Sequence, residues 1–97
     1  MNMKIYLTKW TSWQEFFGSV YVFNEITKLV YIFCDSAEVF WNAMISDNDV
    51  DRMTSTLCDY YESDSRDQIH EDLLMFIEEL ESFGLVQKEE VMGNGEL

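Results

Sequence analysis

The chain has 97 residues, the size of one small domain, and carries a net charge of −13 from 19 acidic and 6 basic side chains. This charge repels phosphate, so we expect no nucleic-acid partner. Apolar residues make up 47% of the chain and aromatic residues 15%, too many for a disordered protein.

The first third of the chain has the composition of β-structure. Residues 20–23 (VYVF) and 29–33 (LVYIF) are β-branched and aromatic, as in strands. Residues 24–28 (NEITK) between them predict a turn. The stretch 4–17 is expected to add a further strand or an arm. An antiparallel sheet of two or three strands is therefore predicted.

Three helices are predicted after the sheet. Residues 35–38 (DSAE) and 65–68 (SRDQ) have the form of capping boxes, in which side chains satisfy free N–H groups of the first turn. Gly84 stands where a glycine would close the third helix with a positive φ. The predicted inward faces are Val39, Phe40, Ala43 and Met44, then Val50, Met53, Leu57, Tyr60 and Tyr61, then Ile69, Leu73, Phe76, Ile77 and Leu80.

This order predicts an α+β fold of the winged helix-turn-helix type, with the antiparallel sheet placed before three α-helices. We expect a single domain over residues 1–97 with its core at about 20–86 and a flexible tail at 87–97. No apolar run is long enough for a signal peptide or a membrane span, so we expect no membrane association and a cytoplasmic protein.

Catalytic chemistry is not indicated by the sequence. The chain has two cysteines, Cys34 and Cys58, and one histidine, His70, which cannot supply the three or four converging ligands of a zinc or iron–sulfur site. We expect two buried or half-buried thiols in a reducing compartment. No nucleophile–base pair and no phosphate-binding loop is present, so we expect no enzyme, no cofactor and no metal.

Taken in order, these segments resemble the PqqD-like family, also known as RiPP recognition elements. The family typically shows a strand ending in Leu-Asn, a helix with Thr-Ala-Ala and then Trp, a second helix ending near Tyr, and a third reading Asp-Val-Leu-x-Phe-Leu-x-x-Leu before Gly-Leu. The corresponding segments here are 35–44 (DSAEVFWNAM), 50–61 (VDRMTSTLCDYY), 72–80 (DLLMFIEEL) and 83–86 (FGLV).

The resemblance covers about residues 20–86, with two departures. Phe33 and Cys34 stand where Leu-Asn is usual, and Lys28 stands near the place of a frequent turn glycine. The resemblance implies a stand-alone protein that binds the leader of a ribosomally made precursor peptide by strand addition. It further implies delivery to a peptide-modifying enzyme, with radical-SAM enzymes among the candidates.

The resemblance also implies where the peptide would bind. An edge strand offers free N–H and C=O groups, and the third helix would form the other wall of the groove. Alternation divides the strand 29–33 into two faces. The resulting candidates for peptide binding are Leu29, Val30, Tyr31, Ile32 and Phe33 on the strand, and His70, Leu74, Ile77 and Glu81 on the third helix.

Several alternatives stay open at this level. Leu74 and Tyr31 could equally be ordinary core residues, and His70 is more typical of a plain surface histidine. Trp10, Trp13, Phe16 and Phe17 either cover a sheet face or dock on the modifying enzyme.

Two further alternatives concern the whole molecule. The edge strand could pair two copies into a homodimer. A rival function is that of a small acidic interaction module, such as an antitoxin, an inhibitor or a DNA mimic. A winged-helix DNA binder is disfavoured because the third helix has Arg66 and no lysine.

Overall fold

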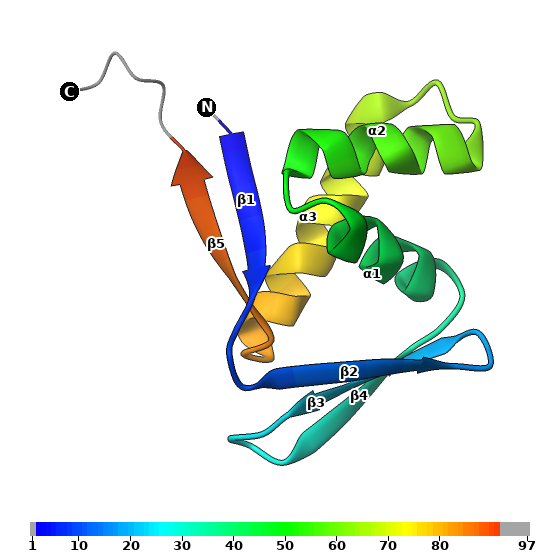
Figure 1. Ribbon diagram of the computed structural model, residues 1–97. Coiled ribbons are helices and arrows are strands. Elements are labelled where there is room, and N and C mark those ends of the chain that lie inside the picture. The colour runs from blue at the N-terminus through cyan, green and yellow to red at the C-terminus, as the bar shows by residue number, and fades with distance from the viewer. Residues whose placement is uncertain (1, 92–97) are drawn as a thin grey trace.

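Strands come first and last along the chain, and the three helices lie between them (Figure 1). The structure is a computed structural model and describes residues 2–91. In chain order the elements are β1 (Asn2–Leu7), β2 (Thr11–Phe16), β3 (Ser19–Asn24), β4 (Leu29–Phe33), α1 (Ser36–Ser46), α2 (Val50–Tyr61), α3 (Arg66–Ser82) and β5 (Val86–Val91). The predicted α+β class, with an antiparallel sheet before three helices, is confirmed.

Strands β2, β3 and β4 form one antiparallel sheet with β3 in the centre. Side chains alternate between two faces along each strand. Val20 and Val22 of β3 are completely buried on the inner face, which packs against the helices. In register with Val22 lie Trp13 of β2 and Tyr31 of β4, so both point inward as well.

Two tight turns join these three strands. Phe16 pairs with Ser19, which leaves Phe17 and Gly18 as a two-residue loop with φ of 54° and 77°. Two positive φ values in succession are typical of a type I′ hairpin turn. In the turn before β4, Lys28 has a φ of 68°, so it adopts the left-handed conformation for which glycine is better suited.

Strand β5 pairs with β1 in a second antiparallel sheet that the sequence did not predict. Residues 87–91 of the predicted flexible tail belong to this strand, so that part of the prediction is wrong; residues 92–97 lie outside the described part. Ile5 of β1 and Val86 of β5 are buried and anchor the two strands to the core. Residues 87–90 are exposed, in keeping with their polar side chains. The amide of Ile5 also donates to the carbonyl of Asn48, joining β1 to the loop before α2.

The helix spans agree with the predicted segments, but the two capping boxes do not form. Neither Asp35 nor Ser65 makes a side-chain hydrogen bond to its helix, and Asp35 has a φ of 56° in place of the extended backbone of a cap. Asp49 does cap α2, because its carboxylate accepts from the amide of Arg52 at 3.2 Å. Gly84 has the predicted positive φ, at 77°.

The core is built mainly from the predicted helix faces. Trp41, which was not among the predicted inward residues, is completely buried and stacks on Phe33 of β4 at 5.8 Å between ring centroids. Tyr60 and Tyr61 of α2 are exposed, against the prediction, because the last turn of α2 extends beyond the core. The buried helix residues are Phe40, Trp41, Ala43 and Met44 in α1, Val50, Met53, Thr54 and Leu57 in α2, and Leu73, Ile77 and Leu80 in α3.

Polar side chains from the first strands hold the C-terminal end of α3. Asn24 donates from Nδ2 to the carbonyl of Phe83 at 3.0 Å, and Trp10 donates from Nε1 to the carbonyl of Gly84 at 2.8 Å. The hydroxyl of Thr11 donates to the carbonyl of Leu85 at 3.0 Å. These carbonyls belong to the C-cap residue of α3 and the two residues after it, so the bonds tie the end of α3 to β2, β3 and the loop before β2.

Both cysteines are free thiols. Cys58 is half-buried, as predicted, whereas Cys34 is exposed. Cys34 follows the last residue of β4 and leaves the sheet before α1 begins, which turns its side chain toward solvent.

Candidate functional site

Strand β4 is an edge of the three-stranded sheet. It pairs with β3 on one side, and within residues 2–91 no strand pairs with its other side. Alternate N–H and C=O groups along such an edge are free to bond to an extended chain. Its span, Leu29–Phe33, coincides with the predicted segment. Leu29, Tyr31 and Phe33 lie on the inner face and Val30 and Ile32 on the outer face.

Aromatic rings from β4 and α3 pack against each other. The ring of Tyr31 stacks on that of Phe83, with centroids 4.3 Å apart and planes at 16°. Two residues along β4, the ring of Phe33 lies edge-on to that of Phe76, with centroids 5.6 Å apart. We call these four residues the aromatic cluster. It fixes the free edge of β4 against α3, with large apolar side chains next to any peptide laid along that edge.

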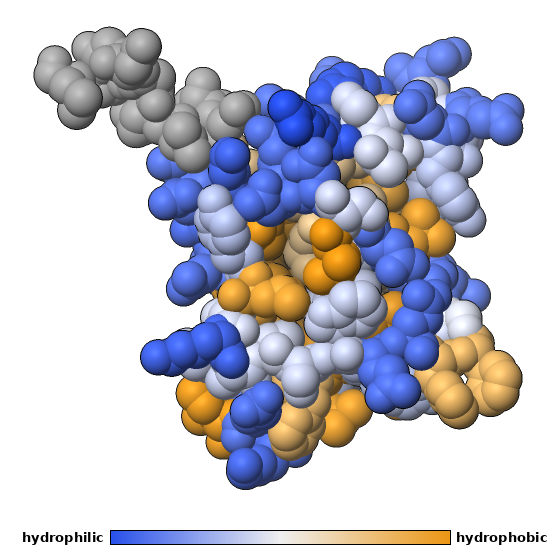
Figure 2. Space-filling model, in the orientation of Figure 1, coloured by the Kyte–Doolittle hydropathy of each residue, from blue (hydrophilic) through white to orange (hydrophobic). Residues whose placement is uncertain are grey.

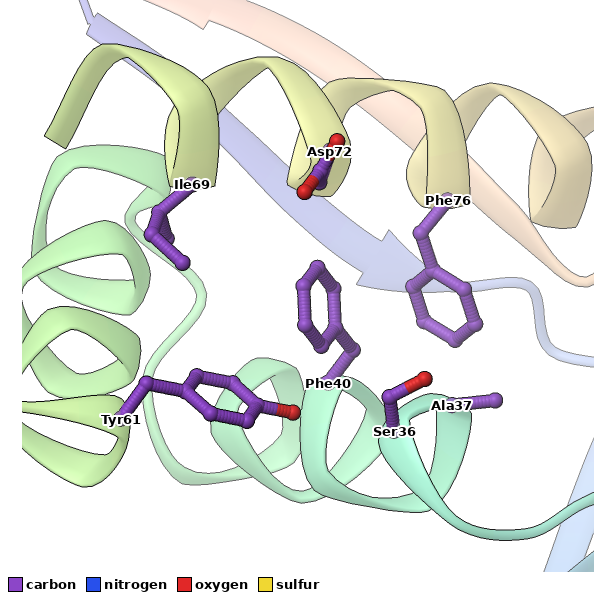
Figure 3. A pocket seen from close by; sticks show the side chains of 7 residues that line it. All are labelled: Ser36, Ala37, Phe40, Tyr61, Ile69, Asp72 and Phe76. Carbon is purple, nitrogen blue, oxygen red and sulfur yellow. The ribbon is translucent and has the colours of Figure 1, made fainter. Parts of the chain in front are cut away.

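A pocket lies beside Phe76 of this cluster, between α1, α2 and α3 (Figure 3). It has a volume of about 410 Å³, and we call it the helix pocket. Figure 3 shows the rings of Phe40 and Phe76 side by side, with Asp72 pointing in from α3. Its lining residues are Ser36, Ala37, Phe40, Tyr61, Ile69, Asp72 and Phe76.

The helix pocket is apolar apart from a few polar groups at its rim. Asp72 is the one ionisable carboxylate among the lining residues, and it accepts a hydrogen bond from Nε2 of Gln68 at 2.9 Å. Partial burial raises the pKa of the Tyr61 phenol, and the neighbouring Tyr60 adds to the effect. Tyr61 is therefore a neutral hydroxyl at physiological pH. The pocket could therefore accept an apolar side chain of a ligand. Oxygen atoms of the pocket rim would then lie near the end of that side chain as hydrogen-bond acceptors.

Comparison with known proteins identifies the family of this chain. Residues 20–86 match the family model described as coenzyme PQQ synthesis protein D (PqqD). The chain belongs to the PqqD family. This confirms the resemblance found in the sequence, over the same residues.

A solved structure is similar to this PqqD-family chain. It is described as TbiB1 in complex with the TbiA(beta) leader peptide, and it superposes with a TM-score of 0.76. The similarity covers 84% of this chain and 93% of TbiB1 at 15% sequence identity, so the two proteins share a fold. A search among curated proteins found no match.

The predicted candidates on α3 do not face β4. Ile77 is 1% exposed and belongs to the core, so it cannot contact a peptide. Glu81 forms an ion pair with Lys88 of β5 at 3.2 Å, which identifies its flank of the helix as the one beside β5. His70 and Leu74 lie eleven and seven residues before Glu81 and share that flank.

The residues that do face β4 lie on the opposite flank of α3. Phe76 and Phe83 contact β4, and Ile69, seven residues before Phe76, lines the helix pocket. The sequence carries a signal for this second stripe, because three large apolar residues recur at a spacing of seven, which is about two helical turns. Ile69 and Phe76 were assigned to the centre of the core, whereas both are half-buried at its border.

The other edge of the sheet, β2, is less suited to an apolar peptide. Glu15 of β2 lies on the inner face beside Glu38 of α1, which also accepts from Nδ2 of Asn42 at 2.8 Å. The pKa of Glu15 is raised because it shares a hydrogen bond with Glu38, with burial and repulsion between the two carboxylates adding to the effect. An apolar peptide along β2 would therefore meet two acidic groups.

Two further observations bear on function. Within residues 2–91 no group of three His, Cys, Asp or Glu side chains is arranged to hold a metal ion. In the same part of the chain, no helix is both long enough and apolar enough to cross a membrane.

Proposed function

We propose that this chain binds the leader segment of a ribosomally synthesised precursor peptide along the free edge of β4. The observation that carries the proposal is the juxtaposition of an unpaired edge strand and the helix pocket, which the aromatic cluster links through Phe76. Membership of the PqqD family supports it, as does the shared fold with TbiB1, whose solved structure includes a leader peptide.

Binding would extend the sheet by one strand. The leader's N–H and C=O groups would bond to those of β4, and every second side chain would point inward toward Tyr31 and Phe33. One inward side chain would enter the helix pocket, where Asp72 favours a ligand that carries a hydroxyl, an amine or a guanidinium beyond its apolar part. Backbone bonding would supply general affinity, and the pocket would supply selectivity.

The chain would contribute binding and no chemistry. We infer that it presents the core of the precursor peptide to a separate modifying enzyme, as members of its family do for radical-SAM and other peptide-modifying enzymes. Because precursor peptides are made by ribosomes, we expect this encounter in the cytoplasm. The rival function, an acidic interaction module such as an antitoxin, is not favoured by either comparison.

The direct test is a titration of the purified chain with fluorescently labelled leaders from short precursors encoded near its gene, followed by fluorescence anisotropy. We expect micromolar or tighter binding for the correct leader. A proline scan across that leader should then weaken binding at every second position, because only alternate N–H groups face β4 and proline lacks this group.

A scrambled leader of the same composition is the control for nonspecific attraction. Equal binding of the two peptides, or a proline scan without a period of two, would count against strand addition. Failure of every neighbouring leader to bind would contradict the proposed function as a whole.

A further inference from the structure

The outer face of the three-stranded sheet, turned away from the helices, is apolar and uncovered. Cross-strand pairs make it continuous, because Tyr21 of β3 lies beside Ile32 of β4 and Phe23 beside Val30. Val30 is 55% and Ile32 57% exposed. We define the outer face by the residues of this side of the three strands, which are Ser12, Gln14, Phe16, Ser19, Tyr21, Phe23, Val30 and Ile32.

The outer face contains no charged residue, although the whole chain is highly charged. A hollow of about 400 Å³ on it is lined by Gln14, Phe16 and Tyr21. In Figure 2 hydrophobic side chains gather at the end of the molecule formed by this sheet. Large exposed apolar patches on small proteins mark interaction sites.

Phe17 extends this surface at the tip of the β2–β3 turn. It is 93% exposed, and its ring lies 4.4 Å from that of Phe16. Its φ of 54° is unfavourable for a bulky side chain, and asparagine is the residue best suited to the position before Gly18. An aromatic residue that is 93% exposed and held at an unfavourable φ buries little apolar surface in the fold, which points to a role in binding.

The structure thereby separates the four aromatic residues of the segment 10–17. Trp10 bonds to Gly84, and Trp13 packs edge-on against the buried Trp41 at 5.8 Å. Both are structural. Phe16 and Phe17 make no comparable contact with the core and point outward.

We propose that the outer face, together with Phe17, is the docking surface for the peptide-modifying enzyme; this inference rests on the function proposed above. The partner's matching surface would be apolar at its centre and rich in Lys and Arg at its rim. The net charge of −13 favours such a partner, opposes a second copy of the same chain and opposes an anionic membrane.

The position of β4 links this surface to the leader. β4 would bond to the leader through its edge while its outward side chains, Val30 and Ile32, contact the enzyme. A leader added beyond β4 would continue the outer face with its own outward side chains. The enzyme would therefore bind the loaded domain more tightly than the empty one, which directs it to chains that carry a peptide.

The test measures two affinities separately. Leader binding is followed by anisotropy on the domain alone, and enzyme binding by calorimetry with the purified peptide-modifying enzyme encoded beside the gene, with and without leader. The variants are Phe17→Asn and the double change Phe16→Thr with Tyr21→Thr, which puts β-branched residues on β2 and β3 and leaves β4, the strand proposed to pair with the leader, unchanged. Met75→Gln, at an exposed apolar position of α3, is the control.

We expect Phe17→Asn to raise the urea midpoint of unfolding and yet weaken enzyme binding about tenfold or more, as for an aromatic hot spot. In the double variant, enzyme binding should be weakened to a similar extent and leader affinity should be unchanged. The increase in enzyme affinity caused by the leader should be smaller than in the wild type. Met75→Gln should leave both affinities unchanged.

Three results would overturn the inference. Normal enzyme binding by both outer-face variants would exclude this surface while leaving leader recognition intact. Equal enzyme affinity with and without leader would remove the proposed link. If light scattering showed that the wild type is a dimer and the double variant a monomer, the outer face would be assigned to self-association. Loss of leader binding by the wild-type domain is a different outcome and would refute the proposed function.

Discussion

A β-carbon at Gly84 would lie 3.0 Å from Nδ2 of Asn24, the atom that donates to the carbonyl of Phe83. Glycine is therefore required at this position for two reasons, its positive φ and the close approach of a side chain that holds the end of α3. Since Phe83 also stacks on Tyr31, this contact helps to hold α3 against β4.

We predict that Gly84→Ala lowers the free energy of unfolding by about 2 kcal/mol, from backbone strain and displacement of Asn24. Gly18→Ala is the matched control, because Gly18 has the same φ of 77° with no atom within 4 Å of the added carbon. For that variant the free energy of unfolding should fall only by the cost of backbone strain, about 1 kcal/mol. Urea unfolding measures both, and equal losses would mean that the contact with Asn24 is unimportant.

Substitutions on the two flanks of α3 should affect leader affinity differently. Ile69 lines the helix pocket, whereas Leu74 lies on the flank beside β5, and both are half-buried. We expect Ile69→Ala to weaken leader binding roughly five- to tenfold, which corresponds to about 1 kcal/mol of lost apolar contact. Leu74→Ala should lose stability with little change in affinity. Anisotropy titrations that gave the reverse ranking would assign the peptide to the other flank.

The Glu15–Glu38 pair predicts a pH dependence of stability. The pKa of Glu15 is raised in the folded protein, chiefly by its hydrogen bond to Glu38. The folded state therefore binds a proton that the unfolded state releases, so stability falls as pH rises from the ordinary pKa of glutamate through the raised one.

Glu15→Gln keeps a hydrogen-bond donor and removes this titration. Its melting temperature should exceed that of the wild type at about pH 7, and the difference should shrink toward about pH 4. Glu78→Gln, at an exposed position of α3, removes the same charge and corrects for the general relief of negative charge. Identical pH profiles for the two variants would show that the pair has no specific effect.

The turn before β4 offers a stabilising substitution. Lys28 has a φ of 68°, a conformation in which a side chain costs about 1 kcal/mol. We expect Lys28→Gly to raise the free energy of unfolding by up to that amount. Lys28→Ala removes the same charge and keeps the β-carbon, so it should give no gain in urea unfolding. A comparable gain from both variants would attribute the effect to the side chain and not to the backbone.

Local patterns in the sequence determined the elements of this protein. Residues 29–33 are β-branched and aromatic and form β4 over that span, and the helical period of 50–61 yields α2. Gly84 marked the end of α3, because its required φ is a property of a single residue. The order of these elements, with the resemblance over 20–86, was sufficient to predict the fold and the edge strand.

The tertiary structure decided what depends on contacts distant in sequence. Strand β5 exists because residues 86–91 pair with β1, from 79 to 89 positions earlier, and its own polar sequence gives little sign of this. In the segment 10–17, the two tryptophans contact the rest of the fold and the two phenylalanines point outward, and this division is decided only once β2 has a partner and a register. The rotation of α3 about its axis, which turns Phe76 and not Leu74 toward β4, is set by packing of the whole core; the seven-residue spacing of apolar residues marks a stripe on α3 but not the element that the stripe faces.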